Sequence, residues 1–261
     1  MKRSMSVAGS FYPARSVEIE RYFEHFNTVY EENFTMPNLK SRAVIVPHAG
    51  YVYSGYTANI AYKILERSGV KKFVVIGPSH RVGFEGISLC DFTSYETPFG
   101  DINSENEIAQ KIKEKFSLPC YLDAHHEHST EVQFPFIKHY IPDAKIVELV
   151  YSSVDSQDVS KIIDFVLSMD DYGVIISTDL SHFYDEKQAN LLDNVCLKAV
   201  KNLDLELVHE GCEACGIIGV KAMMLSAKKL SLTSHLLDYR TSADASGDTS
   251  RVVGYMSACF S

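Results

Sequence analysis

Three short runs of apolar, mostly β-branched residues constrain what this chain can fold into more than any other feature. They read AVIV at residues 43–46, KFVVI at 72–76 and GVIIS at 173–177. Near-continuous apolar runs of this length are typical of strands that are buried on both faces. Helical patterns separate the runs, and alternating strands and helices indicate an α/β fold. We therefore predict a three-layer α/β fold with a mostly parallel central sheet and helices on both faces.

The segments around these runs supply the remaining predicted elements. A helix is expected from about Thr57 to Gly69, since glycine is a common C-terminal stop. A second helix is expected to open at Ser104, with Glu107 completing a capping-box pattern. Further predictions are a strand at 145–150, helices at 156–169, 186–202 and 217–227, and an antiparallel strand pair at 233–240 and 251–259. No repeat or linker interrupts the sequence, so we predict a single domain over residues 1–261.

Charge and hydropathy exclude several classes of protein. The basic N-terminus is not followed by an apolar run of signal-peptide length, and no stretch approaches the ~20 apolar residues of a membrane span. We therefore expect a soluble, cytoplasmic protein. The net charge of −9, without a basic stripe, argues against nucleic-acid binding. Phosphate-binding glycine loops and the Gly-x-Ser-x-Gly elbow are missing from the sequence, so no nucleotide cofactor is expected.

Six cysteines are scattered through the sequence, at positions 90, 120, 196, 212, 215 and 259. In a cytoplasmic protein of this size we expect free, mostly buried thiols rather than a disulfide framework. Cys212 and Cys215 form one CxxC without a second pair, which disfavours a structural zinc site. Cys215 precedes a predicted helix, whose dipole can lower a thiol pKa. It is either a reactive thiolate that lines a pocket or a buried structural cysteine.

Polar residues follow each of the three apolar runs at the point where the strand ends. His48 follows the first, His80 the second, and Asp179 with His182 the third. Ligands of open α/β sheets bind beyond the carboxyl ends of the strands. We expect the four side chains to meet there, although each could instead hydrogen-bond its own loop. Two histidines and a carboxylate suit ferrous iron, with copper or zinc as alternatives, and an unligated His182 suits acid–base chemistry.

A second polar cluster reads HHEHSTE at residues 125–131. Such a run is often a solvated helix N-terminus that one of its hydroxyl side chains caps. Alternatively, His126, His128 and Glu131 line the predicted pocket or support the metal ligands. Both interpretations remain open.

Two further candidates lie outside these clusters. The polar segment at 240–251 is a hairpin loop in the simplest interpretation, but Asp244 or Asp248 could supply the carboxylate that a two-histidine site lacks. Tyr53, close to His48, either lines a pocket that accepts an aromatic molecule or packs at a sheet edge.

The motifs together resemble those of the MEMO family, and most closely those of its microbial members. The resemblance is carried, in order, by VAGSFYP (7–13), VPHAGYVYSG (46–55), GPSH (77–80), EHSTE (127–131), STDLSH (177–182) and GDTSRVVGY (247–255). It implies a fold similar to the LigB-like class III extradiol dioxygenases, in which two histidines and a glutamate hold ferrous iron and another histidine acts as base. Carried over, His48 and His80 match the metal-binding histidines, and His182, with Asp179 beside it, matches the base.

The resemblance also shapes the expected ligand set. Animal members are thought to use a cysteine as the third ligand, whereas this sequence has Ala245 there, beside Asp244. Asp244 is therefore the expected substitute.

The resemblance implies a metal-dependent, dioxygenase-like oxidoreductase that acts on a small molecule, with aromatic compounds as first candidates. The alternatives are a non-catalytic ligand- or protein-binding protein that uses the same pocket, and a zinc hydrolase. The animal members bind phosphotyrosine segments of a receptor, a function that we do not carry over. Microbial members are often encoded beside an AMMECR-type protein and a radical-SAM protein, which are the expected partners.

Overall fold

Four parallel strands form the centre of the sheet in the computed structural model, which describes residues 1–261. They lie in the order β7 (Lys145–Tyr151), β3 (Lys72–Pro78), β8 (Tyr172–Ser177) and β2 (Ala43–Val46). Every residue of these strands is buried except the first residues of β3 and β7. Burial on both faces explains why the strands are continuous apolar runs rather than alternating ones.

Shorter or antiparallel strands extend this centre on both sides. Their bounds are β1 (Lys2–Arg3), β4 (Ile87–Ser88), β5 (Ser94–Tyr95), β6 (Ile102–Ser104), β9 (His182–Tyr184), β10 (Ser234–Thr241) and β11 (Val252–Phe260). The full order is β1-β5-β6-β7-β3-β8-β2-β11-β10, with β4 on β7 and β9 on β11. β10 and β11 pair antiparallel, which confirms the predicted strand pair.

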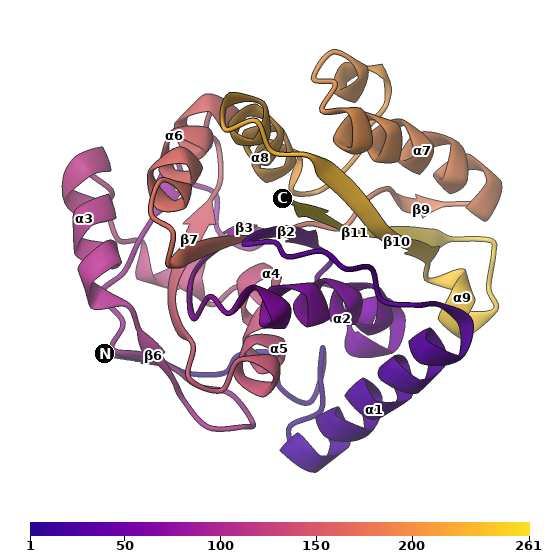
Figure 1. Ribbon diagram of the computed structural model, residues 1–261, viewed down its shortest axis with the longest axis horizontal. Helices are drawn as coiled ribbons and strands as arrows, with labels where there is room; N and C mark the ends of the chain where they lie inside the picture. The colour runs from indigo at the N-terminus through magenta and orange to yellow at the C-terminus, as the bar shows by residue number, and fades with distance from the viewer.

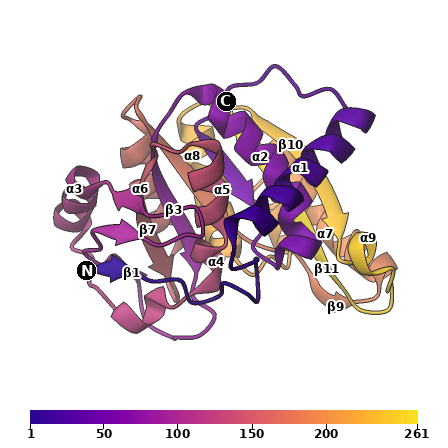
Figure 2. The same cartoon turned by 90° about the horizontal axis from the view of Figure 1, so that it is seen from below.

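Helices cover both faces of the sheet (Figure 1), and Figure 2 shows the same layers from below. One face carries α1 (Ser16–Asn33), α2 (Tyr51–Ser68) and α5 (Gln133–Tyr140). The other carries α3 (Asn106–Phe116), α6 (Ser156–Leu167), α7 (Glu186–Asn202) and α8 (Ile217–Lys229). The short pieces are α4 (His128–Glu131), α9 (Ala243–Ser246), and the 3₁₀ turns at Leu122–His125 and Leu207–Glu210. None of the helices combines the length and apolar character that crossing a bilayer requires.

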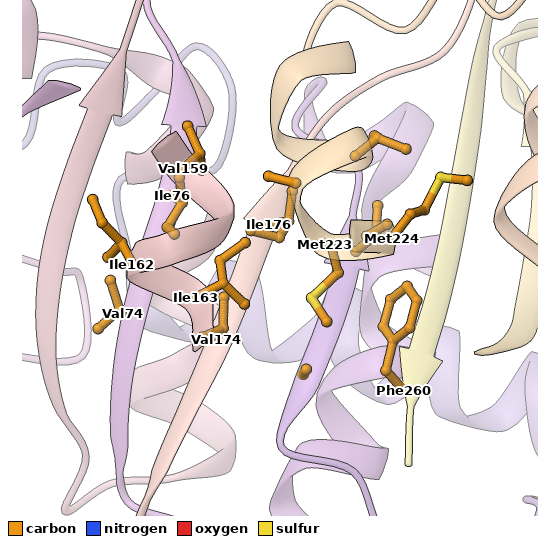
Figure 3. Close-up of a cluster of buried hydrophobic side chains, with 14 of the residues drawn as sticks. Val74, Ile76, Val159, Ile162, Ile163, Val174, Ile176, Met223, Met224 and Phe260 are labelled. Atoms are coloured by element: carbon orange, nitrogen blue, oxygen red, sulfur yellow. The ribbon is translucent and has the colours of Figure 1, made fainter. Parts of the chain in front are cut away.

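Two hydrophobic cores, one on each face, hold the layers together. Because successive side chains of a strand point to opposite faces, Val74 and Ile76 of β3 pack toward α6 and α8, whereas Phe73 and Val75 face α2. Figure 3 shows the first core, in which the labelled helix residues are Val159, Ile162, Ile163, Met223 and Met224. Fully burying one such side chain stabilises the fold by about 1.5–3 kcal/mol. The predicted α/β class with a mostly parallel sheet and helices on both faces is confirmed.

Two helix starts differ from the sequence prediction. α2 begins at Tyr51, a full turn and more before Thr57, and ends as predicted at Gly69, whose φ of +75° suits glycine. The capping box at Ser104 is wrong. Ser104 is the last residue of β6 and pairs with Ile146, so the sheet holds its backbone and α3 starts two residues later without a side-chain cap.

The prediction that all six cysteines are free is also wrong. Cys90 is bonded to Cys120, and Cys196 to Cys212, with 4.7 Å between the Cα atoms of each pair. The partners are 30 and 16 residues apart in sequence, and only the fold brings them together. Cys215 is one of two cysteines that remain free. The CxxC is therefore not a unit, because its first cysteine is bonded outside the motif.

Candidate metal centre

The carboxyl ends of the central strands place three of the predicted site residues at one edge of the sheet. His48, His80 and Asp179 each stand two residues beyond the ends of β2, β3 and β8. These strands are adjacent and parallel, so their ends lie side by side. The backbone N–H of His48 donates to Asp179 Oδ1 over 2.7 Å and ties two of the strand ends together.

Three imidazoles converge at this edge: those of His48, His80 and His128. One ring nitrogen from each lies within 4.8 Å of the others, which is an arrangement that can hold a metal ion. The ring centroids of His80 and His128 are 4.5 Å apart, and each lies little more than 5 Å from that of His48. Nitrogens that share a tetrahedral metal ion are about 3.4 Å apart. Closing the cluster around an ion therefore requires side-chain shifts of roughly an ångström. We call these three residues the histidine cluster.

The hydrogen bonds of Ser177 define which nitrogen of His48 faces the cluster. Its single hydroxyl hydrogen goes to the carbonyl of Ser129, and it accepts from the amide of Gln133. His48 Nδ1, 2.9 Å from Ser177 Oγ, must therefore carry the proton and donate it. Nε2 keeps its lone pair and points toward the cluster. Burial lowers the pKa of His48 well below its usual range, and His80 and His128 add to this effect, so the imidazole is neutral.

Glu127 orients the other two imidazoles. Its carboxylate accepts from the backbone N–H of His80 over 2.7 Å, and Oε1 lies 3.1 Å from His80 Nδ1. Oε1 also accepts from the backbone of His128 and lies 2.7 Å from His128 Nδ1, a close contact that is not aligned as a hydrogen bond. Burial alone would raise the pKa of Glu127, but contacts with His128 and His80 outweigh it and lower the pKa. The ionised carboxylate faces both Nδ1 atoms and leaves both Nε2 atoms free.

Asp179 and Cys215 stand beside His48. The nearest carboxylate oxygen of Asp179 is 3.9 Å from His48 Nε2, and Cys215 Sγ is 3.4 Å from it. The two residues are joined through their backbones, because Asp179 N–H donates to Cys215 Sγ and Cys215 N–H donates to the Asp179 carbonyl. Burial raises the pKa of Asp179, and it raises the pKa of the Cys215 thiol to about 12. The sequence predicted that the helix dipole could lower the pKa of Cys215, but the effect of burial is larger and the pKa is raised.

His182 lies near the cluster without belonging to it. It is half-buried in β9, where it pairs with Val253 of β11. Its charge contributes to lowering the pKa of both His48 and Asp179. Tyr53, on the first turn of α2, is 43% exposed. Both predicted residues lie outside the three-histidine group, and both are open to solvent at least in part.

The structure places the remaining predicted residues elsewhere. Asp244 is exposed on α9, and its carboxylate accepts from the backbone N–H of Thr241 over 2.8 Å. It lies outside the group that could hold a metal ion, and the third member of that group is His128. His126 is exposed and outside the cluster, and it lines a cavity with the first residues of the protein. Glu131 is fully buried and binds the N-terminal segment, as detailed below.

The sequence predicted His128 as a residue of the pocket wall and not as a metal-ligand candidate. It did not predict that Glu127 would orient His80 and His128. His128 enters from α4, which lies against β3, rather than from a strand end. The available signal was the Glu-His pair itself, a carboxylate next to an imidazole in a polar run.

Comparisons with known proteins agree on one family. A family model described as "Memo-like protein" matches residues 3–259. A MEMO1 family protein of Aquifex aeolicus is 32% identical, over 99% of this chain and 98% of its own length. A MEMO1 family protein of Methanobrevibacter smithii is 33% identical over the full length of both chains. One from Thermoplasma acidophilum is 32% identical over 98% of each. These names give a family and no activity.

Proposed function

Since the chain belongs to the family of Memo-like proteins, we propose that it is a metal-dependent enzyme in which His48, His80 and His128 hold one divalent ion. The observation that carries this proposal is the convergence of three imidazoles whose Nδ1 atoms face protein acceptors. Neutral imidazole suits iron, copper and zinc, and hard ions such as Mg²⁺ prefer oxygen ligands. The donor set therefore fits a transition metal.

The first candidate reaction is an oxygen-dependent oxidation of the type that ring-cleaving dioxygenases carry out. Its support is the resemblance of the strand-end motifs to those enzymes, which is an argument by analogy. Ferrous iron bound at the cluster would supply the redox chemistry. Phe11, whose ring is 4.6 Å from that of His128, flanks the cluster and favours an aromatic substrate.

Two residues of the chain have proposed roles in proton handling and positioning. His182 is half-buried, lies outside the three-histidine group and acts through its charge on the pKa of His48, so we assign it the role of accepting a proton from a substrate hydroxyl. Asp179 holds the backbone of His48 in place through its 2.7 Å hydrogen bond. We expect His182→Ala to keep the metal and to lose turnover. A variant that loses the metal instead would contradict this division of roles.

The decisive experiment is elemental analysis of protein purified anaerobically without a histidine tag. Wild-type protein is expected to hold close to one iron or copper ion per chain, and His48→Ala/His80→Ala to hold none. His126→Ala is the matched control, because this histidine is near in sequence but outside the cluster, and it should retain the metal. Equal metal content in all three, or none in any after iron loading, would overturn the proposal.

A zinc hydrolase is the second candidate, and one observation favours it. The cluster holds three histidines and no carboxylate, a ligand set that catalytic zinc sites use. Turnover by the zinc-loaded protein without oxygen would identify this class, whereas oxygen uptake by the iron-loaded protein would identify the first. A metal-bound protein without turnover on any substrate would fit a binding role for the same pocket.

We propose that the protein acts in the cytoplasm, with an AMMECR-type protein and a radical-SAM protein as candidate partners. Its two disulfides fit that compartment in hyperthermophiles, whose intracellular proteins are rich in disulfides. Size-exclusion chromatography of purified mixtures tests the partners. Separate elution of all three proteins would argue against a stable complex.

A further inference from the structure

Cys215 is held close to the histidine cluster by hydrogen bonds of its own backbone and of the next residue, Gly216. Its backbone N–H donates to the Asp179 carbonyl, and the N–H of Gly216 donates to Thr178 Oγ1 over 2.9 Å. Tyr151 donates its hydroxyl hydrogen to the Gly216 carbonyl. A Cβ at position 216 would lie 2.7 Å from the side chain of Thr178, so only glycine permits this close packing. The sulfur is therefore positioned by the fold rather than by a free loop.

The hydrogen bonds around Cys215 show which acceptors its thiol faces. His48 carries its proton on Nδ1, as Ser177 requires, so Nε2 can only accept. Cys215 Sγ, 3.4 Å away, has the only side-chain hydrogen within hydrogen-bonding reach of Nε2. Sγ itself accepts from the backbone N–H of Asp179 over 3.2 Å. Of the three acceptors around the thiol, Nε2 is the nearest at 3.4 Å, while the Asp179 carbonyl and Thr178 Oγ1 lie at 3.7 and 3.8 Å.

The distance between these two atoms matches the geometry of a shared metal ion. Zinc binds sulfur at about 2.3 Å and imidazole nitrogen at about 2.0–2.1 Å, which places the two ligand atoms about 3.6 Å apart at a tetrahedral angle. The observed 3.4 Å is within a few tenths of an ångström of that value. Sγ lies outside the group of ligand atoms that are all within 4.8 Å of one another, so it has to move toward His80 and His128 to share the ion. Asp179, the competing ligand on the same side, is farther from Nε2 at 3.9 Å.

We infer that Cys215 is a fourth ligand, whose thiolate binds the same ion as His48, His80 and His128. This inference rests on the proposed metal site. On binding, the S–H bond breaks, a metal–sulfur bond forms and one proton leaves to solvent. The thiolate adds a soft, negatively charged ligand to three neutral ones, which favours zinc, copper or iron over manganese and magnesium.

Cobalt substitution of the full-length protein tests the inference, because Co²⁺ bound to a thiolate absorbs in the near-ultraviolet through sulfur-to-metal charge transfer. The metal is titrated into wild-type protein, Cys215→Ser and Cys259→Ser, without thiol reductants so that both disulfides stay intact. Cys259 is the matched control, since it is free but buried in β11, where it pairs with Val44 of β2. We expect the band in wild-type protein and Cys259→Ser and none in Cys215→Ser, which should bind cobalt at least about 10-fold more weakly.

The outcomes separate this inference from the proposed function. Cobalt bound without the band in wild-type protein, or an unchanged band in Cys215→Ser, overturns the role of Cys215 and leaves the three-histidine site standing. No cobalt bound by wild-type protein overturns both. X-ray absorption of the zinc-loaded wild-type protein gives an answer that needs no variant. A sulfur neighbour at about 2.3 Å supports the inference, and a shell of nitrogen and oxygen alone contradicts it.

Discussion

Two polar clusters come from the same short segment, residues 125–131, and they use histidine and glutamate in opposite ways. His128 and Glu127 belong to the histidine cluster at the sheet edge. His125 and Glu131 turn the other way, where they form a buried network with Arg3 and Glu148. We call these last four residues the buried network.

Apart from Arg3 Nε, the buried polar side-chain atoms of the network have hydrogen-bond partners within the protein. His125 Nδ1 is 2.7 Å from Glu148, and its Nε2 is 2.9 Å from the hydroxyl of Ser88. Glu131 accepts from Arg3 over 2.8 Å and from the N-terminal segment, through the backbone of Ser6 and Val7 and the hydroxyl of Tyr12. In the histidine cluster, by contrast, protein acceptors face only the Nδ1 atoms. Residue type therefore does not distinguish the two sets of histidines. What distinguishes them is the second ring nitrogen, which in His125 bonds Ser88 and in the histidine cluster belongs to the group that could hold a metal ion.

The largest expected effect comes from Glu131, on the structural side of this comparison. Glu131→Ala leaves the buried guanidinium of Arg3 without its closest carboxylate partner and releases the N-terminal segment. We expect the free energy of unfolding to fall by about 4 kcal/mol in urea denaturation. Glu18→Ala, which removes an exposed ion pair with Arg15, is the control and should cost under about 1 kcal/mol. A similar loss of unfolding free energy in both variants would show that the buried network does not stabilise the protein more than a surface ion pair does.

Glu148 gives the buried network a pH dependence. Burial on its own would raise the pKa of Glu148, but the charges of His125 and Arg3 outweigh it, and the pKa is lowered. Because the folded-state pKa lies below the unfolded value of about 4.3, the stabilisation is fully present above that pH and is lost as the pH falls through the folded-state pKa. Glu148→Gln should lose about 3 kcal/mol of unfolding free energy at neutral pH. The gap to wild type should narrow in acid, and a constant gap would contradict the prediction.

The smallest expected effect is on metal affinity. It comes from Glu127, the glutamate of the segment that contacts the histidine cluster. Glu127→Gln keeps the size of the side chain but replaces the charged acceptor of His80 and His128 with a weaker one. We expect metal affinity to fall by about 10- to 100-fold in a competitive chelator titration. The exposed His126 is the control, and His126→Ala should leave affinity unchanged. Unchanged affinity in Glu127→Gln would show that the histidine cluster does not depend on this carboxylate.

The sequence predicted those parts of the fold and site that depend on strand ends. Continuous apolar runs identified the buried parallel strands, and the rule that ligands bind beyond their carboxyl ends brought His48, His80 and Asp179 together. Both predictions rest on local patterns whose consequences are fixed by sheet geometry.

What the sequence could not show depends on contacts between distant segments. Within residues 125–131, the direction of each side chain is decided by partners such as Arg3 and Glu148, more than a hundred residues apart from one another. The same holds for the two disulfides and for Asp244, whose carboxylate bonds its own turn instead of a metal. Spacing along the chain carries no information on such choices.

The position of β11 in the sheet also affects how the protein is made. β11 lies between β2 and β10, and its Ala258 is opposite Ile45 of β2. During synthesis β2 leaves the ribosome early. The edge of β2 that faces away from β8 has no hydrogen-bonding neighbour until residues 252–260 follow. An unpaired apolar edge is a template for pairing with other chains, and pairing between such distant segments is slow. The growing polypeptide is therefore most prone to aggregation in the interval between the emergence of β2 and that of β11.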